Sequence, residues 1–250
     1  MRIALPITEI LEKVLIGKGM MSKTTDEIII LDEIPPRVEF EGLASRLRLK
    51  DESRVRAKNL LEEVWPLVVA KAVYRACYVE HRSDGGVTIG GVHWKSKVLH
   101  KRLEQVGRVF TYVVTLGSGL EEKAQASADA LEKYYLDEIG NAAVVKARDF
   151  LREHLQSRYR IEALSTLGPG QLGDWPLEAQ RPLFSLLGDV QRAVGVRLTE
   201  SLLMRPAKSL SGIFFPTETT FFACQLCPRE KCPSRRAKYN EELAEEYGLR

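Results

Sequence analysis

Three cysteines near the end of the chain have the spacing of metal ligands. Cys224, Cys227 and Cys232 form the pattern Cys-x-x-Cys-x-x-x-x-Cys. In a reducing compartment, thiols clustered in this way indicate a metal site more than disulfides. An iron–sulfur cluster is bound chiefly by cysteine and tolerates an open position, whereas zinc requires a fourth ligand and no histidine follows His154. The alternatives are therefore an iron–sulfur cluster, zinc and free thiols, in that order.

A glycine- and proline-rich loop offers a second kind of chemistry. Gly168-Pro169-Gly170 permits close approach of a ligand to the backbone, because glycine carries no side chain and adopts unusual dihedral angles. By itself, such a loop is more often an ordinary connector between elements. The Gly117-Ser118-Gly119 turn lacks the third glycine of a dinucleotide-binding loop and is interpreted as a plain turn between a strand and a helix.

Helices and strands follow one another irregularly along the chain. The patterns predict strands at 72–81, 87–89, 92–94, 109–116, 209–215 and 221–226, and helices at 8–16, 51–64, 96–103 and 121–158, while 25–34 fits either. Asp174 is expected to cap a further helix, with Pro176 in its first turn. Gly140-Asn141 is a candidate interruption of the long helix. This mixed order favours an α+β fold with an antiparallel sheet.

The long predicted helix should bury one face. Its expected interior positions are Leu131, Tyr134, Tyr135, Ile139, Ala142, Val145 and Phe150. Apolar residues at helical spacing are expected to lie in the interior of the protein.

Composition excludes several classes of protein. The chain has 250 residues, 44% hydrophobic and 28% charged, with a net charge of +3, which is ordinary for a globular protein and too small for a dedicated nucleic-acid binder. It contains no apolar run of about 18 residues, as a membrane span would need. No secretory signal is expected at the N-terminus, and we expect a cytoplasmic protein without a membrane or nucleic-acid partner.

A run of motif residues between positions 194 and 212 points to one family. The matched positions are Gly195, Leu198, Thr199, Glu200, Ser201, Met204, Pro206, Ser209, Ser211 and Gly212. In this register they resemble the activation domain of cobalamin-dependent methionine synthase, in which Gly-x-x-Leu-Thr-Glu-Ser precedes Met-x-Pro and a Ser-Val-Ser-Gly strand. Gly168-Pro169-Gly170 occupies the place of the family's Pro-Gly-Tyr loop, and Phe221-Phe222-Ala223 that of a Tyr-Tyr-Ala strand. The resemblance extends over about 51–226.

The resemblance implies a fold and a cofactor. The fold is a methionine synthase activation domain-like α+β domain, an antiparallel twisted sheet flanked by helices. The expected organisation is an N-terminal segment at 1–50, the activation-like domain at 51–222 and a Cys-rich metal-binding tail at 223–250. Members of this family bind S-adenosylmethionine and return cob(II)alamin to methylcobalamin: one electron gives Co(I), and the sulfonium donates a methyl group. The implied partners are a corrinoid-binding methyltransferase, or its cobalamin domain, and an electron donor protein.

The same resemblance implies ligand-binding residues. These are Gly168, Pro169, Gly170, Gln171, Glu200, Ser209, Ser211, Phe221 and Phe222, and no catalytic residue is assigned. Two positions depart from the family: Thr166 stands in place of its arginine and Gln171 in place of its tyrosine, so a guanidinium and a phenol are missing. The S-adenosylmethionine site is therefore altered, weakened or completed by other residues, for which Arg197 and Arg205 are candidates.

Three functions are compatible with these patterns. The leading one is a stand-alone, S-adenosylmethionine-dependent reactivation partner of a cobalamin-dependent methyltransferase. The second is a corrinoid- or S-adenosylmethionine-binding subunit without a reactivation role, which the departures at Thr166 and Gln171 favour. The third is a zinc-stabilised interaction protein that uses its basic Cys tail on nucleic acid, against which the interspersed glutamates of that tail argue.

Overall fold

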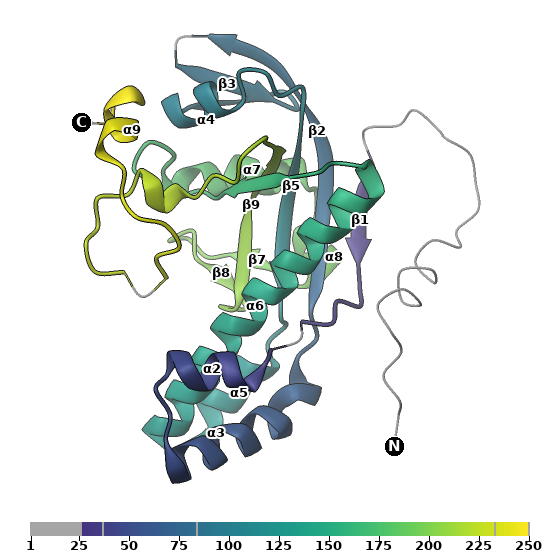
Figure 1. The fold of residues 1–250 in the computed structure, drawn as a ribbon. Helices are drawn as coiled ribbons and strands as arrows, with labels where there is room; N and C mark the ends of the chain where they lie inside the picture. Colours follow the sequence, from purple (N-terminus) through teal and green to yellow (C-terminus); the bar gives the residue numbers. More distant parts are fainter. Residues whose placement is uncertain (1–26, 37, 84, 233, 250) are drawn as a thin grey trace.

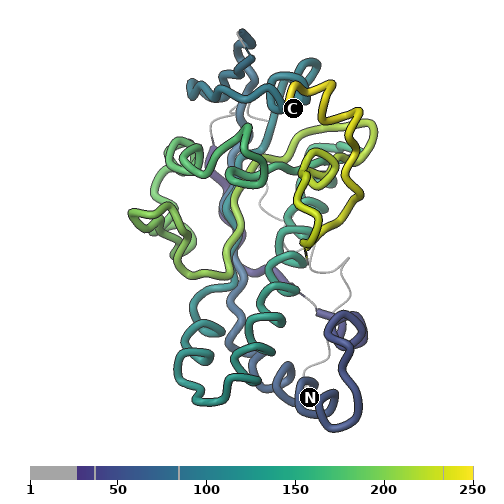
Figure 2. Tube along the Cα trace, turned by 90° about the vertical axis from the view of Figure 1, so that its left-hand side faces the viewer, coloured from purple at the N-terminus to yellow at the C-terminus, as the bar shows by residue number. Residues whose placement is uncertain are grey.

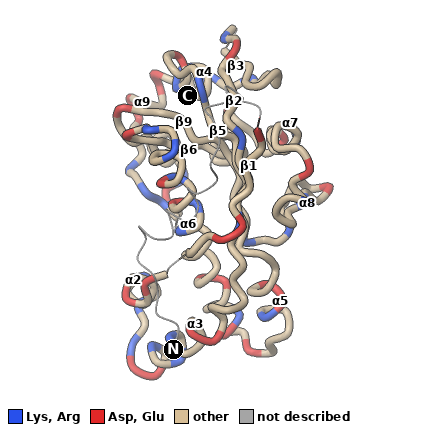
Figure 3. Tube along the Cα trace, turned by 90° about the vertical axis from the view of Figure 1, so that its right-hand side faces the viewer, with Lys and Arg blue, Asp and Glu red and all other residues tan. Residues whose placement is uncertain are grey.

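The structure is a computed structural model, which describes residues 27–249 apart from residues 37, 84 and 233. The helix predicted at 8–16 lies outside the described residues. Within the described part of the chain, no helix is long and apolar enough to cross a membrane. Lysines and arginines are interspersed with aspartates and glutamates along the chain trace (Figure 3).

An antiparallel sheet forms the centre of the molecule (Figure 1). Its strands are β1 (Ile28–Leu31), β2 (Lys71–Ser83), β3 (Gly86–Ile89), β4 (Val92–Lys95), β5 (Arg108–Thr115), β6 (Leu164–Leu167) and β9 (Ser209–Pro216). The order is β4-β3-β2-β5-β9-β6, with β1 paired to β2 as well, and each pair is antiparallel. The predicted α+β class with an antiparallel sheet is confirmed. A separate hairpin joins β7 (Arg197–Leu198) and β8 (Met204–Arg205).

Helices cover both faces of this sheet. They are α2 (Phe40–Arg46), α3 (Asp51–Val64), α4 (Lys97–Arg102), α5 (Gly119–Ala126), α6 (Ala130–Tyr159), α7 (Gln180–Leu186), α8 (Val190–Val194) and α9 (Glu241–Glu246). Short 3₁₀ turns lie at Trp65–Leu67, Leu177–Ala179 and Ala223–Gln225. The turn at Trp65–Leu67 contains Pro66 and ends α3, as expected of a residue that lacks an amide donor.

The alternation of side chains along the strands creates two hydrophobic cores. On β5, Phe110, Tyr112 and Val114 belong to the core beneath α3 and α6, whereas Val109 and Val113 face the core of α4, α7 and α8. Figure 2 shows α6 on one side of the sheet and the green segment that includes α7 and α8 on the other. Leu226, Ala244 and Tyr247 of the C-terminal segment are buried in the second core.

The long predicted helix is interrupted in a different place from the one expected. Two helices, α5 and α6, replace it, and the Asp129 carboxylate caps α6 by accepting hydrogen bonds from the amides of Leu131 at 2.8 Å and Glu132 at 3.3 Å. Gly140 lies inside α6, where a Cβ would be 2.9 Å from Cε of Lys208. The glycine therefore provides room for a neighbouring side chain and does not break the helix.

The interior face predicted for this helix was partly wrong. Tyr135 and Ile139 are buried as expected, but Leu131, Tyr134 and Val145 are exposed. Further buried positions of α6 are Leu136, Gly140, Ala143, Val144, Ala147, Arg148, Leu151, His154 and Leu155. The buried stripe follows the position of the sheet, which the apolar residues of the helix do not specify by themselves.

Two other segments differ from their predictions. The strand expected at 221–226 is wrong, because Phe222 leads into the 3₁₀ turn Ala223–Gln225. Residues Leu164–Leu167, for which no strand was predicted, form the edge strand β6 on β9. The strand and hairpin predictions for 72–95 and the Ser96 cap of α4 are confirmed.

A buried tyrosine–histidine pair makes stability depend on pH. Tyr74 Oη and His154 Nε2 are 3.0 Å apart, and burial together with the nearby Arg158 guanidinium lowers the pKa of His154 below its ordinary value. Because the folded-state pKa lies below the unfolded value of about 6.5, stability is full above that pH and is lost as the pH falls toward the folded pKa.

We therefore expect the free energy of unfolding, measured with urea, to fall between neutral pH and the acidic range. The His154→Gln variant, which cannot take up this proton, should lose less on acidification. His93→Gln, at an exposed position of the β3–β4 hairpin, serves as the control and should behave like the unmodified protein. Equal acid sensitivity in all three proteins would contradict the assignment.

Candidate functional site

A cavity of 280 Å³ brings the glycine loop and the motif strand together. Its lining residues are Gly168, Pro169, Gly170, Gln171, Leu177, Gln180, Leu202, Leu203, Met204, Leu210 and Ser211. The loop after β6, the turn before α7, the β7–β8 hairpin and the start of β9 thus form one site. Of the residues predicted to bind a cofactor, the structure gathers Gly168, Pro169, Gly170, Gln171 and Ser211 here.

Glycines are required where the loop crosses β9. A Cβ on Gly168 would lie 2.7 Å from the carbonyl oxygen of Ser211, and a Cβ on Gly212 would lie 2.5 Å from that of Leu167. Real Cβ atoms do not approach backbone this closely, so the two segments touch only because both positions lack side chains. Gly170 has a φ of +79°, in the region that favours glycine.

Gln171 closes the loop on itself. Its Oε1 accepts a hydrogen bond from the amide of Gly168 at 3.1 Å, and the amide of Gln171 donates to the carbonyl of Gly168 at 3.2 Å. The residue that replaces the family's tyrosine therefore fastens the loop. Thr166, in the place of the family's arginine, instead pairs with Tyr112: their hydroxyl oxygens are 3.0 Å apart on the other side of β6.

Asp174 connects this loop to a distant helix. Its carboxylate accepts hydrogen bonds from the hydroxyl of Ser96 and from the amides of Lys97 at 3.1 Å and Val98 at 2.9 Å. The expectation that Asp174 caps the helix that follows it was wrong, because the carboxylate caps the N-terminus of α4 instead. The loop is also closed by the amide of Gly170, which donates to the carbonyl of Trp175 at 2.8 Å.

The Leu-Thr-Glu-Ser motif forms the tip of the β7–β8 hairpin beside the cavity. Thr199 Oγ1 accepts a hydrogen bond from the amide of Leu203 at 3.0 Å, and the amide of Thr199 donates to the carbonyl of Leu203 at 2.9 Å. Leu202 adopts a φ of +65°, which is rare for a branched side chain. The turn presents Leu203, 55% exposed, at the edge of the cavity.

Four other predicted ligand residues are not among those that line the cavity. Glu200 is exposed in the hairpin turn, and its carbonyl accepts a hydrogen bond from Arg181 at 3.3 Å. The Ser209 hydroxyl donates to the carbonyl of Pro206 at 2.7 Å, and its Oγ lies 2.8 Å from Thr115 Oγ1. Phe221 is buried, and the Arg102 guanidinium lies 4.0 Å from its ring centre. The Arg236 guanidinium lies 5.0 Å from the ring centre of Phe222. Their ligand contacts remain predictions.

The three clustered cysteines are free thiols in the structure. Among the described residues, no three or more histidines, cysteines, aspartates or glutamates form a group that could hold a metal ion. As placed, Cys224, Cys227 and Cys232 therefore do not fit the donor set of a metal centre, and the iron–sulfur expectation gains no support. The amide of Arg236 instead approaches Sγ of Cys224 at 3.4 Å.

One arginine organises the segment that carries these cysteines. The Arg235 guanidinium donates to the carbonyls of Cys224 at 3.1 Å, Cys227 at 3.2 Å and Ala237 at 3.1 Å, and to that of Arg229. A planar guanidinium with several donors suits such a ring of carbonyl acceptors. Arg235 thus connects four backbone carbonyls of the cysteine loop.

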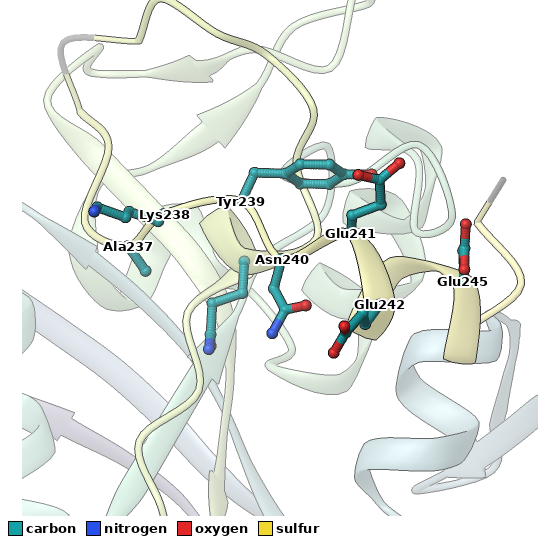
Figure 4. Close-up of a pocket in the computed structure, with 8 residues that line it drawn as sticks. Ala237, Lys238, Tyr239, Asn240, Glu241, Glu242 and Glu245 are labelled. Atoms are coloured by element: carbon teal, nitrogen blue, oxygen red, sulfur yellow. The ribbon is translucent and has the colours of Figure 1, made fainter.

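A second hollow lies where this segment meets α9 (Figure 4). Its volume is 670 Å³, and it is lined by Gln225, Ala237, Lys238, Tyr239, Asn240, Glu241, Glu242 and Glu245. Asn240 caps α9 by accepting a hydrogen bond from the amide of Leu243 at 3.0 Å. None of the residues predicted to bind a cofactor or a metal lines this hollow.

One segment of the chain matches a known family. Residues 174–239 match the family model of the vitamin B12-dependent methionine synthase activation domain. This match supports the predicted resemblance to that family over these residues. The matched range begins at Asp174, contains the hairpin and β9, and continues through the three cysteines, which the sequence patterns had set apart from the domain.

A solved structure has a similar fold over most of the chain. The crystal structure of the MetH reactivation domain bound to AdoHcy superimposes on the chain with a TM-score of 0.53 and 13% sequence identity, over 78% of this chain and 80% of that one. The expected activation domain-like fold is therefore confirmed. The range matched by the family model contains the cavity residues from Leu177 to Ser211 and the three cysteines, whereas the cavity residues at 168–171 precede it.

Proposed function

We propose that the chain binds S-adenosylmethionine in the 280 Å³ cavity and acts as a reactivation partner of a cobalamin-dependent methyltransferase. One observation carries the proposal: in a chain with the activation-domain fold, the glycine loop and the motif strand meet in one cavity. The crystal structure of the related MetH domain holds AdoHcy, which supports an adenosyl ligand here as well.

The residues of the cavity fit part of such a ligand. Glycines at 168 and 212 keep Cβ atoms out of the place where the loop crosses β9. Leu177, Leu202 and Met204 supply apolar walls, as in most small-molecule sites. The charged ends of the ligand find no charged side chain among the lining residues.

The proposed role of the domain is to present the methyl donor to a partner. When bound, S-adenosylmethionine would supply a methyl group from its sulfonium, which would leave as a neutral thioether that keeps the electron pair of the broken carbon–sulfur bond. The partner's corrinoid, reduced by one electron from a separate donor protein, would accept that methyl group. The loop and hairpin of this chain hold the nucleoside and thereby orient the methyl donor.

Binding and turnover test the proposal separately. Calorimetry should show binding of S-adenosylmethionine to the purified chain, and a cob(II)alamin-loaded methyltransferase domain should acquire the methylcobalamin spectrum when chain, ligand and reductant are all present. Binding without this conversion would favour a binding subunit that has no reactivation role. Absence of binding would overturn the proposal. The iron and zinc content of protein purified without oxygen tests whether the cysteine loop binds a metal. The proposed reaction does not depend on that loop.

A matched pair of glycine variants locates the ligand. Gly170 and Gly195 have φ values of +79° and +76°, but a Cβ would meet Leu177 at 3.2 Å in the first and no atom within 4 Å in the second. Both alanine variants should lose about 1–2 kcal/mol of stability through backbone strain. Only Gly170→Ala should also weaken S-adenosylmethionine binding, by about tenfold or more, in calorimetry. Equal affinities in the two variants would place the ligand elsewhere.

A further inference from the structure

A groove between α5 and α6 has an apolar floor. Its volume is 360 Å³, and it shares no lining residue with the 280 Å³ cavity. Leu120, Ala124 and Leu136 line it from the two helices, and Ala207 lines it from the loop between β8 and β9. Leu120 and Leu136 are almost fully buried and belong to the core beneath α6, so the apolar surface continues into the protein. A concave apolar surface of this size is typical of small-molecule sites.

The carboxylates of this groove already have partners. Glu121 accepts a hydrogen bond from the Arg205 guanidinium at 2.6 Å through Oε1 and from the amide of Ala207 at 2.9 Å through Oε2. Asp137 Oδ1 accepts a hydrogen bond from Lys208 Nζ at 2.6 Å. These contacts hold the loop between β8 and β9 against both helices and leave neither carboxylate in need of a cationic ligand.

One lysine of the groove has no counter-charge. Lys133 of α6 lines the groove at an exposed position, and within the described part of the chain its ammonium group forms no ion pair and no hydrogen bond. The other lysine that lines the groove, Lys208, is paired with Asp137. An apolar groove with one uncompensated cation at its edge is complementary to a molecule that has an apolar body and one anionic head.

The volume of the groove limits the size of that molecule. Since a water molecule takes up about 30 Å³ in the liquid, a volume of 360 Å³ holds about ten non-hydrogen atoms. A medium-chain aliphatic acid has this size. Its chain leaves water when it enters the groove, which favours binding, whereas its carboxylate remains at the exposed edge and keeps part of its hydration.

We infer that this groove binds a small amphipathic carboxylic acid. The aliphatic body lies on Leu120, Ala124 and Leu136, and the carboxylate pairs with the ammonium group of Lys133. The site is separate from the cavity assigned to S-adenosylmethionine and does not depend on the proposed function.

Octanoate and octanamide test the inference, because they have the same number of non-hydrogen atoms and differ in charge. In an NMR titration of the isotope-labelled chain, both should shift signals of α5, α6 and the loop between β8 and β9. Octanoate should bind about three- to fivefold more tightly, as expected for an exposed ion pair. High salt should remove this preference. In Lys133→Gln the two ligands should bind equally, whereas Lys133→Arg should retain the preference.

Control variants separate the charge from the apolar surface. Lys146→Gln removes an exposed lysine of α6 that does not line the groove and should leave the preference unchanged. Ala124→Phe fills the groove and should abolish binding of both ligands; Ala207→Phe, at an exposed position of the wall, replaces it if the first variant fails to fold.

Three results would overturn the inference: equal affinities of the two ligands in the unmodified protein, shifts scattered over the whole surface, or a preference that persists in Lys133→Gln. Gly170→Ala, which should weaken S-adenosylmethionine binding, should leave the affinity for octanoate unchanged. The inference and the proposed function can therefore fail separately.

Discussion

Replacing Gly212 by alanine is expected to lower the free energy of unfolding by about 2–3 kcal/mol, the upper range for overpacking. The added Cβ would lie 2.5 Å from the carbonyl oxygen of Leu167 and 3.2 Å from Cα of Gly168. Both are backbone atoms, which cannot rotate away as the end of a side chain can. Relief therefore requires β6 to move on β9, where Leu167 pairs with Ile213.

The same displacement should reach the ligand site. Since Gly168 begins the loop that lines the cavity, Gly212→Ala should also weaken the binding of S-adenosylmethionine. Urea unfolding and calorimetry measure the two effects. Gly173→Ala is the control, because it lies in the same loop but has no atom within 4 Å of a Cβ and no positive φ. It should change stability by less than about 0.5 kcal/mol. Similar losses in both variants would contradict the steric explanation.

Removal of the Asp174 carboxylate is expected to have an effect of comparable size. Asp174→Ala loses three hydrogen bonds to Ser96, Lys97 and Val98 at the start of α4, and we expect a loss of about 2–3 kcal/mol. The variant also releases the loop whose end carries Trp175, a buried ring that packs edge-on against Trp94 at 6.1 Å. Affinity for S-adenosylmethionine should therefore fall together with the melting temperature.

A simple helix cap provides the comparison. Asp189 caps α8 through a single hydrogen bond from the amide of Arg192 at 2.9 Å. Asp189→Ala should cost about 1 kcal/mol, the usual value of a cap, and should leave ligand affinity nearly unchanged. If Asp174→Ala cost no more than this control, the bridge between loop and α4 would contribute little to stability.

Local patterns predicted most of the elements correctly. The strand at β2, the hairpin β3–β4, the Ser96 cap and β9 follow from alternation, turn residues and capping, which act between neighbours in sequence. The errors lie where distant contacts decide. Phe221 and Phe222 have strand-forming side chains, yet Phe221 is held by its amide, which donates to Ser165 Oγ at 2.8 Å, and by the Arg102 guanidinium. No pattern within 221–226 contains these partners.

The candidate site divides in the same way. By itself the sequence predicted the α+β class and the resemblance to the activation-domain family, and it pointed to the loop at 168–170 and to Ser211 as candidate ligand residues, because these depend on residue types in fixed register. Only the tertiary structure showed that the loop and β9 meet, that Gln180 lines the same cavity and that Asp174 caps α4 rather than the helix after it. Such pairings join residues far apart in the chain, and their energy depends on distances that the order of residues does not contain.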